Sequence, residues 1–225
     1  MPSPRRPPAP PARRPAPRRR PAILLGLVAL AALGVAYWAA RGGKATLPPL
    51  DPGRETVVFL GDSITSGHGL PLPLTFPHRL GETLGLGVRN AGVSGDLTAG
   101  GLARLERDVL AHRPKLVVVE LGVNDVFRRV PRDETLRNLR AIVRRVREDG
   151  AGVVLVHIGL GLLRGGDYRD GFRALAREEG AWLVEDFLDG VVPAYSTDGL
   201  HPSEEGHARL AAKLEPVLRE VLTRY

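Results

Sequence analysis

The sequence contains no cysteine. This absence excludes disulfides, zinc sites built on thiolates, a cysteine nucleophile and a lipidated N-terminal cysteine. It says nothing about the cellular compartment, because a protein without thiols tolerates either redox state. Three other signatures are missing as well: the phosphate loop G-x-x-x-x-G-K-[ST], a G-x-G-x-x-G segment after the first predicted strand, and the zinc motif H-E-x-x-H. Nucleotide-binding and common metalloprotease classes are therefore disfavoured.

Acidic residues are absent from residues 1–21, which contain seven arginines. The whole chain has 32 Lys+Arg, 25 Asp+Glu and a formal net charge of +7. Without the seven arginines, 25 basic and 25 acidic residues remain, so residues 22–225 are formally neutral. A fold that binds nucleic acid needs a basic surplus on its surface. We therefore expect no nucleic-acid partner.

The N-terminal region predicts a membrane anchor. Residues 1–21 hold nine of the twenty prolines and should be a disordered tail. Residues 22–40 are uncharged, and a helix of nineteen residues rises roughly 28 Å, close to the hydrocarbon thickness of a bilayer. Residues 41–54, with paired glycines and prolines, are typical of a linker.

The arginines before residues 22–40 place the N-terminus in the cytoplasm by the positive-inside rule. The domain of residues 55–225 would then lie on the periplasmic or extracytoplasmic side of the membrane. Two alternatives remain open. A signal peptide cleaved after the small residues 34–36 would give a secreted protein, and Arg19-Arg20 is compatible with twin-arginine export.

Residues 55–225 alternate between short apolar runs and amphipathic stretches. Apolar runs at 56–60, 115–121 and 152–158, with a weaker one at 181–184, predict buried strands. Apolar residues recur at helical spacing over 136–146 and 210–218. Strands that are buried on both faces and separated by helices predict a parallel sheet covered on both sides. Ligands of such sheets bind beyond the carboxyl ends of the strands.

Four segments are rich in polar residues and glycine: three follow predicted strands, and the fourth is a loop before the last predicted helix. They are residues 61–65 (GDSIT), 90–96 (NAGVSGD), 122–125 (GVND) and 198–202 (DGLHP). In this order and at these separations they closely resemble the GDSL, or SGNH, hydrolase family. The four residues that give the family its name are here Ser63, Gly95, Asn124 and His201. The GDSIT-x-G-x-G-L and NDVFR stretches are most similar to the bacterial arylesterase, thioesterase and lysophospholipase branch.

This resemblance implies a three-layer α/β/α sandwich with a parallel five-stranded sheet, the flavodoxin-like SGNH fold. It also implies a serine esterase. Ser63 would be the nucleophile, His201 would take its proton as general base, and Asp198 would hold the other ring nitrogen of His201. The backbone N–H groups of Ser63 and Gly95 and the side-chain amide of Asn124 would form the oxyanion hole.

Each of these residues also has a purely structural interpretation. Ser63 alone could cap the helix that follows it. His157 lies in an apolar strand and is expected to be a core residue. Asp198, His201 and His207 match no common metal-ligand spacing, so no metal site is expected. Structural roles are expected for the polar residues that flank the proposed site residues, namely Asp62, Asn90, Asp96 and Asp125.

The predicted function is hydrolysis of acyl or aryl esters through an acyl-enzyme, without a metal or cofactor. The alternatives are an acyltransferase or deacetylase that acts on lipid or glycan at the cell envelope, and a binding module without catalysis. Leu162 and Leu163 could line a pocket for an acyl chain or could belong to the core. The sequence does not indicate the natural ester or the oligomeric state.

Overall fold

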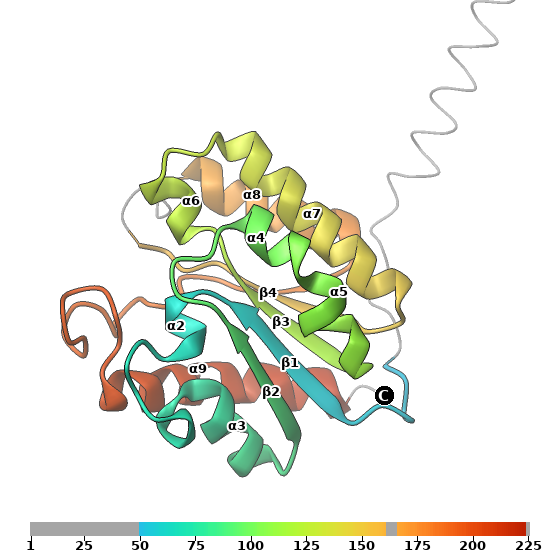
Figure 1. The fold of residues 1–225 in the computed structure, drawn as a ribbon, viewed down its shortest axis with the longest axis horizontal. Helices are drawn as coiled ribbons and strands as arrows, with labels where there is room; N and C mark the ends of the chain where they lie inside the picture. The colour runs from blue at the N-terminus through green and yellow to red at the C-terminus, as the bar shows by residue number, and fades with distance from the viewer. Residues whose placement is uncertain (1–49, 161–165, 224–225) are drawn as a thin grey trace, which may run out of the picture. The chain divides into compact units, whose positions relative to one another are not determined.

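The computed structural model describes residues 50–160 and 166–223 (Figure 1). Five strands form one sheet in the order β2-β1-β3-β4-β5, and all neighbouring strands are parallel. The strands are β1 (Thr56–Gly61), β2 (Gly87–Gly92), β3 (Leu116–Glu120), β4 (Gly152–Val156) and β5 (Trp182–Val184). The five-stranded parallel α/β sheet predicted from the sequence is therefore confirmed.

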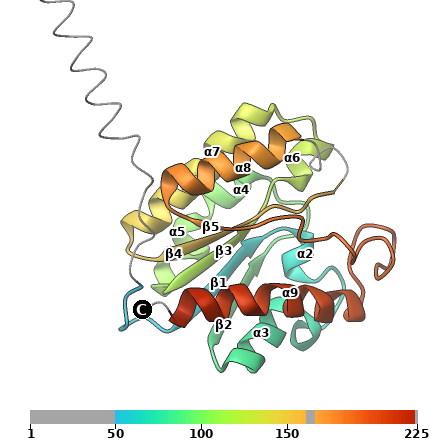
Figure 2. The ribbon, with the colours of Figure 1, turned by 180° about the vertical axis from the view of Figure 1, so that it is seen from behind.

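Helices follow the strands along the chain. The α-helices are α2 (Ser63–Ser66), α3 (Phe76–Leu84), α4 (Thr98–Ala103), α5 (Leu105–Asp108), α6 (Val123–Phe127), α7 (Arg132–Glu148), α8 (Gly166–Glu179) and α9 (Glu204–Thr223). Two short 3₁₀ helices, η1 (Leu72–Leu74) and η2 (Leu110–His112), lie in connecting segments. Helices α3 and α9 cover one face of the sheet, while α4, α5, α7 and α8 cover the other (Figures 1 and 2).

The hydrophobic core is divided in two by the sheet, because successive side chains of a strand point to opposite faces. Val57 and Phe59 of β1 pack in the cluster that includes the apolar residues of α3 and α9. Val58 and Leu60 pack in the other cluster, with those of α7 and α8. All four side chains are fully buried. This two-sided burial explains why the strands are continuous apolar runs in the sequence.

The observed strands differ little from the predicted ones. The second strand, whose place was expected just before Asn90, extends through Asn90 to Gly92. Asn90 and Ala91 pair with Phe59 and Leu60 of β1, so the loop that contains Gly95 starts only after Gly92.

The predicted tail, membrane helix and most of the linker, residues 1–49, lie outside the described residues. Among the helices of residues 50–160 and 166–223, none is long and apolar enough to cross a bilayer. The last residues of the expected linker pack on the domain: Leu50 is buried in the core cluster of α3 and α9. Arg54 donates to the carboxylate of Asp149 at 2.5 Å and to the carbonyl of Pro114 at 3.2 Å. The packed domain thus extends at least to Leu50.

His207 joins α9 to α3 inside the core. Its Nδ1 accepts the backbone N–H of Phe76 at 3.1 Å, and its ring stacks on the Phe76 ring with 5.9 Å between centroids. Burial lowers the pKa of His207 from 6.5 to about 4, because the charged imidazolium would lose its hydration. His207 is a core residue with a neutral ring.

We expect His207 to make the fold less stable in acid. The unfolded chain binds a proton on this ring below about pH 6.5, whereas the folded protein does so only near pH 4. The free energy of unfolding contributed by this group is present above pH 6.5 and is lost as the pH falls toward 4. Urea unfolding of wild type and His207→Asn at several pH values should show a shallower acid loss in the variant. His78→Asn, at an exposed position, is the control; equal slopes in wild type and His207→Asn would contradict the expectation.

Candidate active site

Ser63 stands at the junction between β1 and α2. Asp62 caps the helix, and its Oδ1 accepts the backbone N–H of Ile64 at 3.0 Å. Ser63 is therefore the first residue of α2 rather than its cap, and its side chain is free to point away from the helix end. Only 8% of Ser63 is exposed. The strand–helix junction holds the hydroxyl at the carboxyl edge of the sheet.

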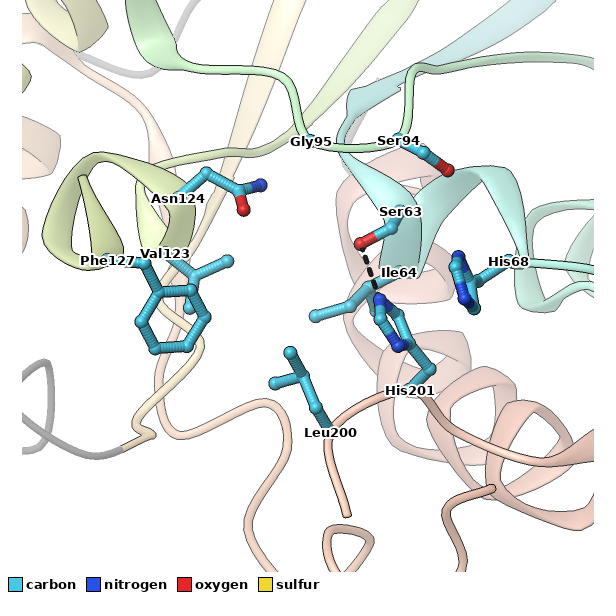
Figure 3. Close-up of a pocket in the computed structure, with 10 residues that line it drawn as sticks. All are labelled: Ser63, Ile64, His68, Ser94, Gly95, Val123, Asn124, Phe127, Leu200 and His201. Carbon is cyan, nitrogen blue, oxygen red and sulfur yellow. Dashed lines mark hydrogen bonds between the residues drawn. The ribbon is translucent and has the colours of Figure 1, made fainter. Parts of the chain in front are cut away.

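His201 approaches Ser63 from the segment between β5 and α9. Its Nε2 lies 3.0 Å from Ser63 Oγ (Figure 3), and its Nδ1 lies 2.6 Å from Asp198 Oδ2. The three side chains that the sequence analysis selected thus form one hydrogen-bonded series. An aspartate–imidazole–hydroxyl series of this kind can carry a proton away from the hydroxyl.

Asp198 is ionised in this arrangement. Its Oδ1 accepts the backbone N–H groups of His201 at 2.8 Å and Leu200 at 2.9 Å. These donors, led by the backbone N–H of His201 and followed by the His201 ring, hold the pKa of Asp198 well below its ordinary value. A carboxylate on Nδ1 makes that nitrogen the protonated one, which leaves Nε2 as an acceptor facing Ser63.

Gly95 and Asn124 lie across the pocket from His201 (Figure 3). Gly95 has φ +75°, a left-handed conformation that favours glycine, and a Cβ there would meet no protein atom within 4 Å. The space beside Gly95 is therefore open. Asn124, near the start of α6, donates from Nδ2 to Asp62 Oδ2 at 3.0 Å and to the carbonyl of Asp96 at 3.1 Å. These two acceptors orient the amide nitrogen.

The segments around these residues are held by polar side chains, as the sequence analysis expected, of which Asp125 is buried and Asn90 half-buried. Asn90 donates to the carbonyl of Thr65 at 2.7 Å and accepts the N–H of Gly92 at 2.9 Å. Asp125 accepts the backbone N–H of Thr98 at 2.9 Å and its hydroxyl at 2.5 Å. Asn90 thereby connects β2 to α2, and Asp125 connects α6 to the start of α4.

Arg104 is a supporting residue that the sequence analysis missed. Its guanidinium donates to Asp96 Oδ2 at 2.8 Å and to the carbonyls of Ala91 at 2.7 Å and Gly61 at 3.1 Å. It thereby joins the ends of β1 and β2 to the loop that carries Gly95. Nothing in the sequence marks this arginine, since two of its partners are backbone carbonyls.

His68 was also missed. Its ring stacks on the His201 ring, with 3.7 Å between centroids and 14° between planes. His68, His201 and Asp198 each offer a metal-ligating atom within 4.8 Å of the others. The lone pairs of imidazole nitrogens lie in the ring plane, so two stacked, nearly parallel rings cannot direct them at one ion. We therefore interpret the stack as packing that holds His201. His207, the other histidine weighed as a ligand, is buried in the core, where its Nδ1 accepts the backbone N–H of Phe76.

The pocket between these groups has a volume of about 300 Å³. Four apolar side chains lie among the polar groups that line it, namely Ile64, Val123, Phe127 and Leu200 (Figure 3). Phe127 is 57% exposed and so stands at the open rim. Leu162 and Leu163, the other candidates for a pocket lining, lie outside the described residues. The described pocket offers a small apolar surface beside the Ser63 hydroxyl.

Comparison with known proteins gives several similar chains. Residues 59–209 match the profile of the GDSL-like lipase/acylhydrolase family. The chain is 34% identical over 180 residues to esterase TesA of Pseudomonas aeruginosa, which covers 75% of this chain and 90% of that protein. It is 34% identical over 169 residues to an arylesterase of Vibrio mimicus, covering 70% and 84%. It is 32% identical over 166 residues to thioesterase 1/protease 1/lysophospholipase L1 of Escherichia coli K12, covering 70% and 80%.

Solved structures agree with these matches. The crystal structure of TesA superposes with a TM-score of 0.68 at 35% identity, covering 74% of this chain and 99% of that one. Similarity therefore extends over nearly the whole length of the solved structure, and the family match over residues 59–209 includes all four polar segments.

Proposed function

Because the chain belongs to the GDSL-like lipase/acylhydrolase family and is a carboxylic ester hydrolase, we propose that it cleaves acyl or aryl esters through an acyl-enzyme on Ser63. The observation that carries this proposal is the hydrogen-bonded series Ser63–His201–Asp198 at the edge of the pocket.

In the proposed first step, Ser63 Oγ attacks the ester carbonyl carbon while His201 Nε2 takes the hydroxyl proton. The carbonyl oxygen becomes an oxyanion. His201 then returns the proton to the leaving alcohol as the C–O bond breaks, and an acyl group remains on Ser63. Water then attacks the acyl carbon while His201 Nε2 takes one of its protons, and a second oxyanion forms. His201 returns that proton to Ser63 Oγ as the acyl–serine bond breaks, so the acid leaves and the free hydroxyl is restored. Asp198 stabilises the imidazolium in both halves.

We assign the oxyanion hole to the backbone N–H groups of Ser63 and Gly95 and to Nδ2 of Asn124. In the free protein both N–H bonds of the Asn124 amide already have acceptors, on Asp62 and on Asp96. An amide nitrogen has only two hydrogens, so the oxyanion must compete with these acceptors. The strength with which Asp62 holds the amide thus bears on catalysis.

The substrate proposal follows from the pocket. A volume of about 300 Å³ with four apolar lining side chains suits a small acyl or aryl group next to Ser63. The relatives are named esterase, arylesterase and thioesterase/lysophospholipase, and an aryl or acyl ester is the chemistry these names share.

We expect Ser63→Ala and His201→Ala each to lower kcat/KM roughly 10⁴- to 10⁶-fold, because each removes one end of the proton-transfer pair. The assay is hydrolysis of p-nitrophenyl esters from acetate to palmitate, with circular dichroism to verify folding. Thr223→Ala, which removes a hydroxyl from the last residue of α9 and away from the pocket, is the control and should keep the wild-type rate. Substantial turnover by either site variant would refute the assignment.

The same assay with added glycerol measures acyl transfer. Formation of a glyceryl ester faster than free acid would indicate the acyltransferase alternative. A folded wild-type protein that hydrolyses no ester and that a fluorophosphonate does not label would exclude serine catalysis altogether.

Asn124→Ala should lower kcat on the order of 10²–10³-fold and change KM much less, because its amide acts on a charge that develops only in the transition state. Steady-state kinetics with a soluble ester would separate the two constants. Asn138→Ala, which removes the same amide from α7 outside the pocket, is the control. A change confined to KM would instead place Asn124 in substrate binding.

We further propose that residues 22–40 anchor the protein in a membrane, with the N-terminus cytoplasmic, residues 41–49 as a linker and the catalytic domain on the outer side. The support is the uncharged nineteen-residue run after seven arginines. When the full chain is expressed in bacteria, it should stay in the membrane pellet after extraction with alkaline carbonate. Protease added to spheroplasts should digest the catalytic domain, because that domain lies on the outer side. A soluble, shortened product with a new N-terminus after residue 36 would indicate cleavage and secretion.

A further inference from the structure

Glu120 is a buried acid that the proposed mechanism does not use. It is the last residue of β3 and only 1% exposed, and in the register of the sheet it pairs with Gly61 of β1, the residue before Asp62. A Cβ on Gly61 would lie 2.8 Å from Glu120 Oε2. The glycine therefore leaves the space that the carboxyl group occupies directly beneath the β1–α2 junction.

The two oxygens of Glu120 have different surroundings. Oε2 accepts the hydroxyl of Thr65 at 2.7 Å, whereas Oε1 is buried and has no hydrogen-bond donor among the described residues. Asp62 comes directly after Gly61, the strand partner of Glu120, and the two carboxyl groups are close enough to shift each other's pKa. No lysine or arginine of the described residues forms an ion pair with either acid. Two ionised carboxylates cannot satisfy each other, but a carboxyl that keeps its proton becomes a donor.

We propose that Glu120 keeps its proton at neutral pH and donates it to Asp62, and that it thereby acts as a positioning residue for the Asn124 amide. Burial, the largest cause, and the charge of Asp62 raise the pKa of Glu120 well above its ordinary value. Burial likewise raises the pKa of Asp62, to about 7. The pair as a whole holds at least one proton.

The proton on Glu120 matters because Asp62 Oδ2 accepts one N–H of Asn124. An Asp62 that also accepts from Glu120 is a weaker acceptor for the amide, so the amide is more readily shared with the oxyanion. When the pair loses this proton, Asp62 and Glu120 are both negatively charged beneath the position where the oxyanion develops. Asp62 then holds the Asn124 amide more strongly. Above the pKa of the pair, kcat should fall. This inference rests on the proposed oxyanion role of Asn124.

Other charged groups around the pair are few. His201 lowers the pKa of Asp62 and Asp96 raises it, while Arg104 is paired with Asp96 at 2.8 Å. Two negative charges on the pair would also act on the positive charge that His201 carries during the reaction. Asn124 is hydrogen-bonded directly to Asp62, whereas the hydrogen bonds of the His201 ring go to Ser63 and Asp198. The effect on the Asn124 amide is therefore the stronger one, and kcat should fall, not rise, at alkaline pH.

The test is the pH dependence of kcat and KM for p-nitrophenyl acetate with the full chain, from about pH 6 to about pH 10. Wild type should lose kcat at alkaline pH with KM little changed. In Glu120→Gln the amide donates to Asp62 at every pH, so the alkaline loss should vanish or move up by at least about one pH unit. At neutral pH the kcat of this variant should stay within about threefold of wild type.

Two further variants keep the test decisive. Thr65→Val removes the donor that stabilises ionised Glu120, so its alkaline loss should move to higher pH. Glu179→Gln replaces a buried glutamate of α8 that is paired with Arg144, far along the chain from the site, and should keep the wild-type profile. If the alkaline loss occurs at the same pH in wild type, Thr65→Val and Glu120→Gln, the proposal is overturned.

Infrared spectroscopy gives a readout that does not depend on turnover. Wild-type protein near pH 8 should show the carbonyl stretch of a protonated buried carboxyl, and Glu120→Gln should lack it while Glu179→Gln retains it. A band that persists in Glu120→Gln, or that is absent from wild type, would refute the shared proton. If the band behaves as expected but Ser63→Ala still hydrolyses the ester, the proposed function fails and the protonation of Glu120 stands.

Discussion

The register of β1 between its two neighbours is the constraint on which the candidate site depends. Gly61 lies beside Gly92 of β2 on one side and beside Glu120 of β3 on the other. Three strands therefore end together, and the residues that follow them meet at one edge: Ser63 after β1, Gly95 after β2 and Asn124 after β3. Because parallel strands expose their carboxyl ends at the same edge, a shift of one strand by a single residue would separate these groups. The close approach is visible at Gly92, where a Cβ would lie 2.2 Å from the backbone nitrogen of Ser66.

The sheet does not place His201, which comes from the long segment between β5 and α9. That segment is held by contacts of its own. Ser196 and Pro202 form an isolated antiparallel bridge, and the Arg209 guanidinium lies 3.6 Å from the centroid of the Tyr195 ring. Lys213 of α9 donates to three backbone carbonyls of the same segment, those of residues 186, 187 and 189. The sheet edge that carries Ser63 and the segment that carries His201 are thus positioned by largely separate contacts, yet they have to meet at hydrogen-bonding distance. The His68 ring stacked on His201 adds a contact between them.

Sequence patterns predicted much of this arrangement for physical reasons. Strands buried on both faces have to be continuous apolar runs, and polar residues at their ends have few roles other than chemistry or loop support. The patterns failed where a contact depends on three-dimensional approach. Arg104 binds carbonyls, which any residue provides, and the stack of His68 depends on a left-handed backbone, with φ +25°, between two glycines. Glu120 did leave a signal: one acid within the apolar run LVVVEL is costly to bury unless it is neutral or paired. The membrane helix expected at residues 22–40 lies outside the described residues, so it stays a prediction.

The acids near Ser63 differ in charge because their surroundings differ. Asp198 is at the surface and accepts three hydrogen bonds from its own turn, all of which favour the ionised form. Asp62 and Glu120 are buried, where ionisation loses hydration, and burial raises the pKa of both. The negative charge that stabilises an imidazolium is therefore on Asp198 at the surface, and with Glu120 protonated as proposed, the interior beneath Asn124 carries one negative charge instead of two. An oxyanion formed beside Ser63 would be attracted by the amide without strong repulsion from below. Carboxyl groups held in opposite protonation states by their environments are how one fold supports both parts of acid–base chemistry.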